Sequence, residues 1–437
     1  MIFKRPSDFQ LIIDPAADYQ ATLIALALAA QMEKATTLER VEETLHVKRA
    51  LRFLESGGVT ADWDGRSVTI DPAVKKPFAF VETDLDYDLL SFMLALAATR
   101  AGSRVAIVDG VDNTIEMIIL ALRRLGAELE FVSGTPDQMV VHQPVNHRIK
   151  YQLTKESAKI TPQLLVAQAG VDGKGEIADL FAEGRFDYIF SHSLAGFRRQ
   201  LLTEPEADDE LQRRLCKQKP VTREHNSRII LEGKLMDEDS SLRLHPDVEF
   251  AAFLAAGVIS NPGGKLILRG FADSDLTNTP LAQLKRMGAQ FERLRDDDTC
   301  GFLVSHSQLK PRKMTYEQLH AYPDAVGALA LANATLDVTT VIRSARYSTE
   351  REEERRRRLC EVMESLGVRV GAISDGIVLE GKSELTAEPI KGADDPITIL
   401  TAVAASLGPV SQIEIDDYSA AAARWGESFR TLLGLYK

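Results

Sequence analysis

An internal repeat runs along this sequence and limits the folds that it can adopt. The first half of the repeat occurs four times. In each copy an acidic residue opens an Ala/Leu-rich helix, and a short turn then leads into an apolar strand. The four acids and their strands are Asp86 with 104–108, Asp247 with 265–268, Asp324 with 339–342, and Asp395 with 412–415. Each acid is a predicted helix N-cap, and the small residues along each helix permit close packing on a sheet.

The second half of the repeat is a helix that ends in a glycine after an apolar segment, followed by two alternating strands joined by a turn. The glycines in question are Gly58, Gly126, Gly288 and Gly367. Glycine at this place predicts the left-handed conformation that closes a helix. The whole unit is therefore β-α-β-α-β-β. At roughly 70 residues a unit, the chain holds about six units, three in each of two lobes.

Composition narrows the classes of function. The 437 residues carry 52 Lys and Arg against 64 Asp and Glu, a net charge of −12, which disfavours a nucleic-acid partner. The three cysteines lack the spacing of a zinc site or a disulfide framework, so we expect a reducing, cytoplasmic location. The most apolar run, 21–32, is too short to span a bilayer, and we expect neither a membrane partner nor a targeting segment.

One stretch links the repeats to a known family. Residues 322–367 contain Tyr-Pro-Asp-Ala, then Arg-Glu-Glu-Glu-Arg, then Leu-Gly, and they are similar without a gap to consecutive motifs of the enolpyruvyl transferases. The chain resembles the EPSP synthases (3-phosphoshikimate 1-carboxyvinyltransferases) more than the UDP-N-acetylglucosamine relatives. The resemblance implies a two-lobe, inside-out α/β barrel fold. It places residues 1–15 with 246–437 in one lobe and residues 16–245 in the other.

The resemblance also implies roles for particular residues. The family joins phosphoenolpyruvate to a hydroxyl group through a tetrahedral intermediate, which requires cations and acid/base groups. Asp324 is then the candidate base and Glu352 a proton relay. The residues expected to bind substrate are Arg351, Arg355, Ser157, Lys159, Ser191 and Asp18. We expect a small anionic or phosphorylated substrate in the cleft between the lobes, no cofactor and no metal, while a protein partner stays open.

Each of these residues also has a plainer interpretation. The charge run 350–358 is typical of a solvated helix with ion pairs one turn apart. Asp324 alone is typical of a helix N-cap, a role compatible with catalysis. Serines such as Ser157 and Ser191 are usually local caps of loops and helices.

The departures from the family concern the donor site. Where the family has a lysine that contacts both substrates, this chain has Asp18. Residues 87–90 lack the glycine of the family's loop, and residues 110–116 have acids where the family has an arginine. The sequence Asp394-Asp395-Pro396 replaces the family's Asp-His-Arg motif, and Ala423, with Arg424 beside it, replaces a lysine. Losing one charge-assisted contact costs about 1.5 to 3 kcal/mol, and each ~1.4 kcal/mol is tenfold in rate. Ordinary EPSP synthase activity is therefore not expected.

Two functions stay open on the sequence alone. The first is a divergent enolpyruvyl, or carboxyvinyl, transferase with altered substrates, which the cluster of Arg351, Glu352 and Arg355 favours. The second is a non-catalytic scaffold or assembly partner descended from an EPSP synthase, which Asp18 and Pro396 favour. The net charge disfavours a third class, an enzyme resembling the RNA-terminal phosphate cyclases.

Overall fold

The chain divides into two compact units in a computed structural model. The structure describes residues 1–80, 87–107, 113–134, 137–147, 150–152, 160–171, 174–180, 202–203, 227–232, 240–277, 279–296, 299–319, 322–343, 350–382, 385–391 and 394–436. The first unit is Met1–Asp18 with His245–Lys437, and the second unit is Tyr19–Leu244. The expected lobe boundaries, after residues 15 and 245, lie close to these divisions. The assignment of residues 1–15 with 246–437 and of residues 16–245 to two lobes of the family's kind stays a prediction.

The second unit contains three four-stranded sheets, in the orders β14-β3-β5-β4, β6-β7-β9-β8 and β10-β11-β13-β12. The strands are β3 (Thr36–Glu39), β4 (Thr60–Asp64), β5 (Ser67–Asp71), β6 (Ala79–Phe80), β7 (Arg104–Ile107), β8 (Glu128–Val132), β9 (Asp137–Gln143), β10 (Lys150–Gln152), β11 (Lys174–Leu180), β12 (Leu202–Thr203), β13 (Ser227–Glu232) and β14 (Ser240–Arg243). The helices are α1 (Tyr19–Ala29), α2 (Leu45–Ser56), α3 (Tyr87–Ala97), α4 (Asn113–Arg124) and α5 (Thr161–Gln168). In each sheet the first two strands are parallel and the other two are added antiparallel, which is the strand arrangement expected of the predicted repeat.

The first unit repeats the same plan in reduced form. Its sheets are β16-β17-β15-β2, β18-β20-β19 and the pair β1-β21. The strands are β1 (Ile2–Lys4), β2 (Phe9–Ile13), β15 (Gly264–Arg269), β16 (Phe291–Asp296), β17 (Thr299–Ser305), β18 (Thr339–Arg343), β19 (Arg369–Ile373), β20 (Gly376–Glu380) and β21 (Gln412–Glu414). The helices are α9 (Val248–Ile259), α10 (Pro280–Met287), α11 (Tyr316–Leu319), α12 (Val326–Ala334), α13 (Glu350–Ser365), α14 (Pro396–Ser406) and α15 (Ser419–Leu433), with short 3₁₀ turns η3 (Asp273–Leu276) and η4 (Gly434–Tyr436).

Two strands pair with partners that are distant in the chain. β2 lies parallel to β15, so the N-terminal strand completes a sheet of the first unit. β14, at the end of the second unit, lies parallel to β3 near that unit's start. The two-lobe α/β fold follows the prediction. Among the described residues, no helix has both the length and the apolar character needed to cross a membrane.

The helix-closing glycines adopt the predicted conformation. All four have positive φ, between 76° and 111°, and follow α2, α4, α10 and α13: Gly58, Gly126, Gly288 and Gly367. An L side chain rarely adopts this backbone conformation, so glycine is favoured where each helix must turn into the following hairpin. The repeat register read from the sequence is confirmed at these positions.

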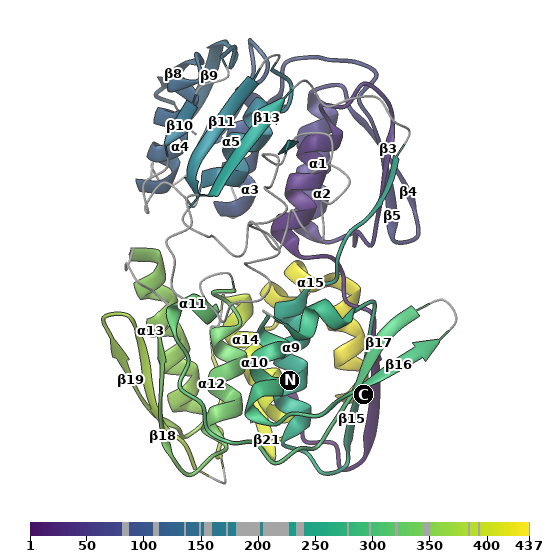
Figure 1. The fold of residues 1–437 in the computed structure, drawn as a ribbon, viewed down its shortest axis with the longest axis vertical. Helices are drawn as coiled ribbons and strands as arrows, with labels where there is room; N and C mark the ends of the chain where they lie inside the picture. The colour runs from purple at the N-terminus through teal and green to yellow at the C-terminus, as the bar shows by residue number, and fades with distance from the viewer. Residues whose placement is uncertain are drawn as a thin grey trace, which may run out of the picture. The chain divides into compact units, whose positions relative to one another are not determined.

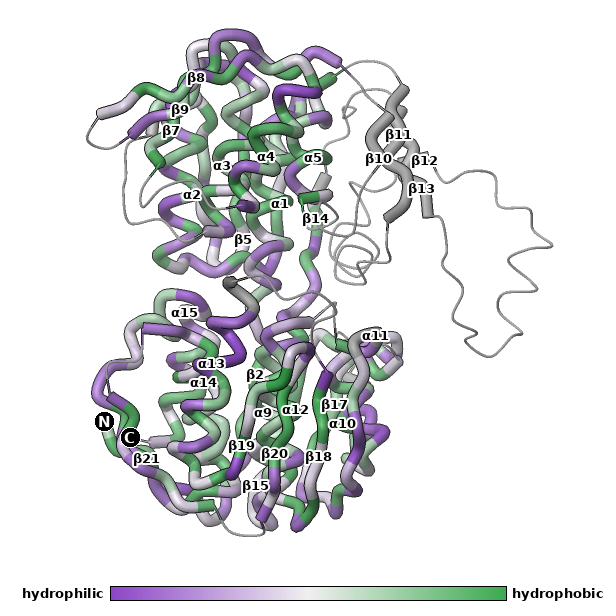
Figure 2. Tube along the Cα trace, turned by 90° about the vertical axis from the view of Figure 1, so that its left-hand side faces the viewer, coloured by the Kyte–Doolittle hydropathy of each residue, from purple (hydrophilic) through white to green (hydrophobic). Residues whose placement is uncertain are grey.

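Three helices form the core of the first unit and start at one end of it. α9, α12 and α14 pack on one another between the sheet of β15 to β17 and the sheet of β18 to β20 (Figure 1). The traces of α9 and α12 are largely hydrophobic (Figure 2), and every residue of both helices is buried. Gly327 of α12 lies so close to the ring of Phe253 that an added Cβ would come within 2.9 Å. At the far end, Asn261 Nδ2 donates to Leu407 O at 2.7 Å, so α9 and α14 also end together.

Candidate functional site

Carboxylates satisfy the backbone amides at the start of α9 and α14. Asp247 Oδ1 accepts hydrogen bonds from the amides of Glu249 and Phe250, at 2.9 and 3.0 Å. Asp395 Oδ2 accepts from the Thr398 amide at 2.7 Å and from its hydroxyl at 2.8 Å. These two predicted N-caps are confirmed, while the third, Asp86, lies outside the described residues. The positive ends of both helices are therefore already neutralised by the chain itself.

The predicted N-cap role of Asp324 is wrong. α12 begins at Val326 after Ala325, and no side chain of its own caps it. Instead, the amides of Asp324 and Ala325 donate to Glu249 Oε1 from the first turn of α9, at 3.0 and 3.1 Å. Because Glu249 takes the capping position from the neighbouring helix, the Asp324 carboxylate points to other partners.

Those partners are two arginines. Arg424 Nη2 of α15 donates to Asp324 Oδ2 at 2.8 Å, and Arg355 Nη1 of α13 lies 3.6 Å from Asp324 Oδ1. The Asp324 side chain is only 6% exposed. Burial opposes the charge on Arg424, but the charges of Asp324 and Asp247 outweigh it and raise the pKa of the guanidinium above its ordinary value. Asp324 and Arg424 therefore form a buried, charged pair.

Three more carboxylates lie beside this pair. Asp18, Asp247 and Glu249 are all buried, and each offers an oxygen within 4.8 Å of the other two. Burial first, and then the charge of Asp18, raise the pKa of Asp247. Trp425 Nε1 donates to Asp247 Oδ2 at 3.0 Å. Hard cations such as Mg²⁺ and Ca²⁺ are coordinated by carboxylate oxygens of this kind. The absence of a metal, expected from the sequence, stays a prediction.

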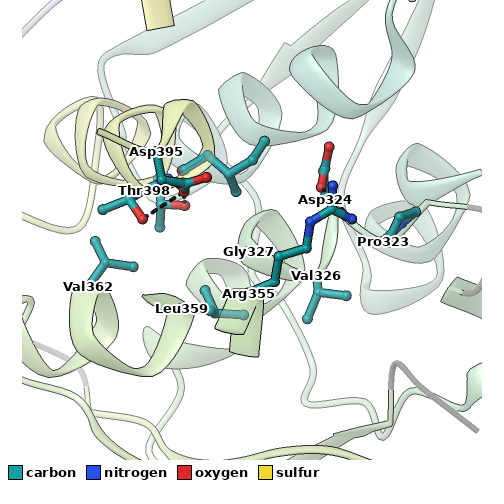
Figure 3. Close-up of a pocket in the computed structure, with 11 residues that line it drawn as sticks. Pro323, Asp324, Val326, Gly327, Arg355, Leu359, Val362, Asp395 and Thr398 are labelled. Atoms are coloured by element: carbon teal, nitrogen blue, oxygen red, sulfur yellow. Dashed lines mark hydrogen bonds and ion pairs between the residues drawn. The ribbon is translucent and has the colours of Figure 1, made fainter. Parts of the chain in front are cut away.

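A small pocket of about 40 Å³ opens beside Asp324, with room for a few water molecules. Arg355 extends from α13 across this pocket toward Asp324 (Figure 3). Its lining combines these charged groups with Asp395, Thr398 and Thr401 and with an apolar wall of Pro323, Val326, Gly327, Leu359, Val362 and Ile397. The pocket thus offers one cation and two carboxylates against an apolar surface.

A larger hollow of about 720 Å³ lies at the opposite ends of the same helices. Its two basic side chains, Arg5 and His306, bond to the backbone oxygens of Gly408 and Ile259 at 3.1 and 2.7 Å. None of the residues predicted from the sequence lines it, so the candidate site is the one at Asp324.

Comparisons with known proteins agree with this architecture. The family model of EPSP synthase (3-phosphoshikimate 1-carboxyvinyltransferase) matches residues 218–432. The 3-phosphoshikimate 1-carboxyvinyltransferase of Streptococcus uberis is 21% identical over 423 residues, which cover 94% of this chain and 93% of that protein. The chain is similar to the EPSP synthases along nearly its whole length, at low identity.

Other relatives match this EPSP synthase-like chain over part of its length. The enzyme of Streptococcus equi subsp. zooepidemicus is 27% identical over 213 residues, 48% of this chain, so the chain spans about half the length of that relative. Among solved structures, EPSP synthase from Acinetobacter baumannii has a TM-score of 0.70 at 18% identity, covering 99% of this chain and 97% of that one. The enolpyruvyl transferase NikO from Streptomyces tendae has a TM-score of 0.75 at 14% identity, covering 99% and 96%.

The structure brings together three of the residues predicted from the EPSP synthase resemblance: Asp324, Arg355 and Asp18. Arg351 and Glu352 lie in the first turn of α13, just before Arg355 along the helix, but their side chains are outside the described part of the structure. Ser157, Lys159 and Ser191 lie outside the described residues altogether. Their roles therefore stay predictions.

Sequence reasoning missed the partners that surround Asp324. In the sequence Arg424 is notable only as a neighbour of Ala423, the position where the family has a lysine, and the structure shows that Arg424 pairs with Asp324 in addition to Arg355. Glu249 carried a signal that was not used. It is the one charged residue in the otherwise apolar α9, and such a residue in a buried helix requires a partner.

Proposed function

We propose that this chain is an enolpyruvyl transferase whose substrates differ from the phosphorylated pair used by the EPSP synthases. The observation that carries the proposal is the pairing of Asp324, just before α12, with Arg355 of α13 in the lining of a pocket, where Arg355 Nη1 lies 3.6 Å from Asp324 Oδ1. An acid/base carboxylate beside an anion-binding guanidinium is the minimum that transfer to a hydroxyl group requires.

In this proposal Asp324 accepts the proton of the acceptor hydroxyl as its oxygen attacks the enolpyruvyl carbon. Arg355 holds the carboxylate of the donor. Glu352 relays the proton to the donor methylene, which gives the tetrahedral intermediate, and Arg351 adds positive charge. Glu352 then takes a proton back from the new methyl group as the donor's leaving group departs with its bonding electrons, so the enolpyruvyl double bond forms again on the acceptor oxygen. Ser157, Lys159 and Ser191 are proposed acceptor contacts. No step requires a metal or an organic cofactor.

The charge balance of the site supports a change of substrate. Five carboxylates, those of Asp18, Asp247, Glu249, Asp324 and Asp395, gather at the starts of the core helices around the guanidiniums of Arg355 and Arg424. Two phosphorylated ligands held side by side would meet this excess of negative charge with two cations already paired. We therefore propose a small anionic substrate that carries less charge than the pair of shikimate 3-phosphate and phosphoenolpyruvate.

A cytoplasmic location belongs to the same proposal. Cys300 and Cys360 are free thiols, as expected in a reducing compartment.

A second candidate is a non-catalytic scaffold that keeps the fold and binds a protein partner. The favouring observation is that Asp324, the proposed base, already accepts from Arg424 at 2.8 Å. A carboxylate in a buried ion pair is a weaker proton acceptor than a solvated one, because ionisation is already favoured.

Calorimetric titration combined with a turnover assay separates the two candidates. The assay supplies hydroxyl acceptors with and without a phosphate, each with phosphoenolpyruvate or with an O-alkyl enolpyruvate, a donor that keeps the carboxylate but has no phosphate. The proposal predicts turnover with at least one pair of lower charge, lost in Asp324→Asn and kept in Asp62→Asn, which changes an exposed aspartate of β4. Absence of binding and turnover across the whole panel favours the scaffold.

A further inference from the structure

Helix α15 sends neighbouring side chains to separate parts of the first unit. Arg424 donates to Asp324 at the start of α12, and Trp425 donates to Asp247 at the start of α9. Ser428 Oγ, one turn further on, accepts from the amide of Ala16 at 3.0 Å. One helix therefore holds the two buried carboxylates and the N-terminal segment.

The Arg424 and Trp425 side chains also support each other. The Arg424 guanidinium lies 5.0 Å from the centre of the Trp425 ring, and that ring packs on Phe250 with centroids 5.4 Å apart. An aromatic face stabilises a cation at this distance and restricts its orientation. The two residues thus act as one packed unit directed at Asp324 and Asp247.

The helix is broken at the next residue. Gly426 has φ 49° and ψ −120°, a non-helical conformation inside α15 that an L side chain would strain. It separates the half of α15 that holds the carboxylates from the half that holds Ala16. The angle between these halves is therefore set at Gly426.

Both segments where the chain passes between its units are tied to this arrangement. The chain leaves the first unit after Asp18 and returns at His245. Within the first unit, Ala17 pairs with Pro246, and the Asp247 amide donates to Ala16 O at 2.8 Å. The residues that α15 holds, Ala16 and Asp247, are thus bonded to each other as well.

We propose that Arg424 and Trp425 are positioning residues of the candidate site, aimed by the break at Gly426, and that Arg424 sets how much of the Asp324 carboxylate is left to Arg355. Arg424 holds Asp324 at 2.8 Å, whereas Arg355 stands off at 3.6 Å and is 38% exposed. While Arg424 holds the Asp324 carboxylate by its hydrogen bond, the Arg355 guanidinium can bind the anionic group of a ligand. Without Arg424, the carboxylate turns to Arg355 and occupies it.

The inference rests on the proposed function only in taking Asp324 as the acid/base group. Its test uses inorganic phosphate as the probe and calorimetric affinity as the readout, so it does not depend on turnover. If transferase activity is absent but the affinities behave as stated below, the proposed function fails and the positioning role stands.

The expected affinities distinguish positioning from direct anion binding and from general damage. Arg424→Met and Gly426→Ala each weaken phosphate binding about tenfold. The control is Gly434→Ala, which leaves the affinity unchanged, because Gly434 has ordinary helical backbone angles and an added Cβ meets nothing within 4 Å. Arg424→Lys keeps the charge and stays within about threefold of the wild type. In an Asp324→Asn background, Arg424→Met and Gly426→Ala no longer weaken binding, because no carboxylate competes for Arg355.

Tryptophan emission reports directly whether the Trp425 ring keeps its buried position. The chain has two tryptophans, so Trp63→Phe leaves Trp425, which is 4% exposed, as the only one. In that background Gly426→Ala shifts the emission to longer wavelength and Gly434→Ala does not. The inference is overturned if the losses of phosphate affinity persist in the Asp324→Asn background, if Gly426→Ala binds like the wild type, or if neither wild type nor Asp324→Asn binds phosphate.

Discussion

Arg424 donates a 2.8 Å hydrogen bond to Asp324, a residue one hundred positions earlier in the chain. The pair joins the last long helix to the start of α12 and fixes the proposed base on one side. Arg355 faces the same carboxylate from the other side at 3.6 Å. The positive charge available to a ligand therefore depends on how the Asp324 carboxylate is shared between the two guanidiniums.

Arg424→Met is expected to destabilise the first unit by about 3 kcal/mol, because the buried Asp247 loses its cation and Asp324 is left with the more exposed Arg355 alone. Urea unfolding measures the change.

The matched control for this prediction is Arg369→Met. Arg369 pairs with Glu380 at 2.9 Å but is 87% exposed, so the change should stay within about 1 kcal/mol. Equal losses in the two variants would show that the Arg424 pair is no more than a surface contact.

Arg355→Ala is expected to weaken inorganic phosphate binding by roughly tenfold, the effect of losing about 1.4 kcal/mol of charge-assisted bonding. Arg357→Ala serves as the control, since Arg357 lies on the same helix but is 57% exposed and bound to Glu354 and Glu361. Calorimetric titration gives both affinities. An unchanged affinity in Arg355→Ala would return Arg355 to a plain helix-surface role.

Asp18→Asn is expected to stabilise the protein in a pH-dependent way. Burial, followed by Asp18, raises the pKa of Asp247 above its ordinary 3.8, so ionising Asp247 costs stability in the folded state. That cost is absent below the unfolded pKa and grows as the pH rises through that value toward the folded pKa. Removing the Asp18 charge should therefore add on the order of 1 kcal/mol at neutral pH and little at low pH.

Urea unfolding of Asp18→Asn near pH 7 and below pH 4 checks this dependence, with Asp62→Asn as an exposed control. A gain of the same size at both pH values would mean that Asp18 does not act through the charge of Asp247.

A glycine series tests the repeat register energetically. Gly126→Ala combines a φ of 91° with overlap between the new Cβ and Asn146 Oδ1. Gly65→Ala has a φ of 62° and open space, and Gly371→Ala has neither strain nor a neighbour within 4 Å. The expected loss of stability is about 2 kcal/mol or more for Gly126, ~1 for Gly65 and near zero for Gly371. Any other order would contradict the helix-closing role of Gly126.

Much of the fold was readable because the repeat carries local physical signals. A glycine such as Gly367 closes its helix for reasons present in a few neighbouring residues, and Asp247 caps α9 in the same local way. The parallel pairing of β14 with β3 was not predicted, since its partners lie about two hundred residues apart and no local pattern joins them.

The site was less readable because its key contacts join distant elements. Asp324 has the local signature of a cap, and only the approach of Glu249 from α9 in three dimensions overrides it. Arg424 lies one residue away from where the family resemblance points, and its role depends on the burial of Asp324. Asp18 stands out in the sequence as an acid where the family has a lysine, but its neighbours Asp247 and Glu249 were not foreseen.

Steady-state turnover of shikimate 3-phosphate with phosphoenolpyruvate by the purified wild-type protein tests the proposal that the substrates of this chain differ from those of the EPSP synthases. Because carboxylates are in excess around Asp18 and Asp324, we predict that the turnover rate is many orders of magnitude below that of ordinary enzymes. Turnover of this pair at about 1 to 10³ per second would contradict the claim.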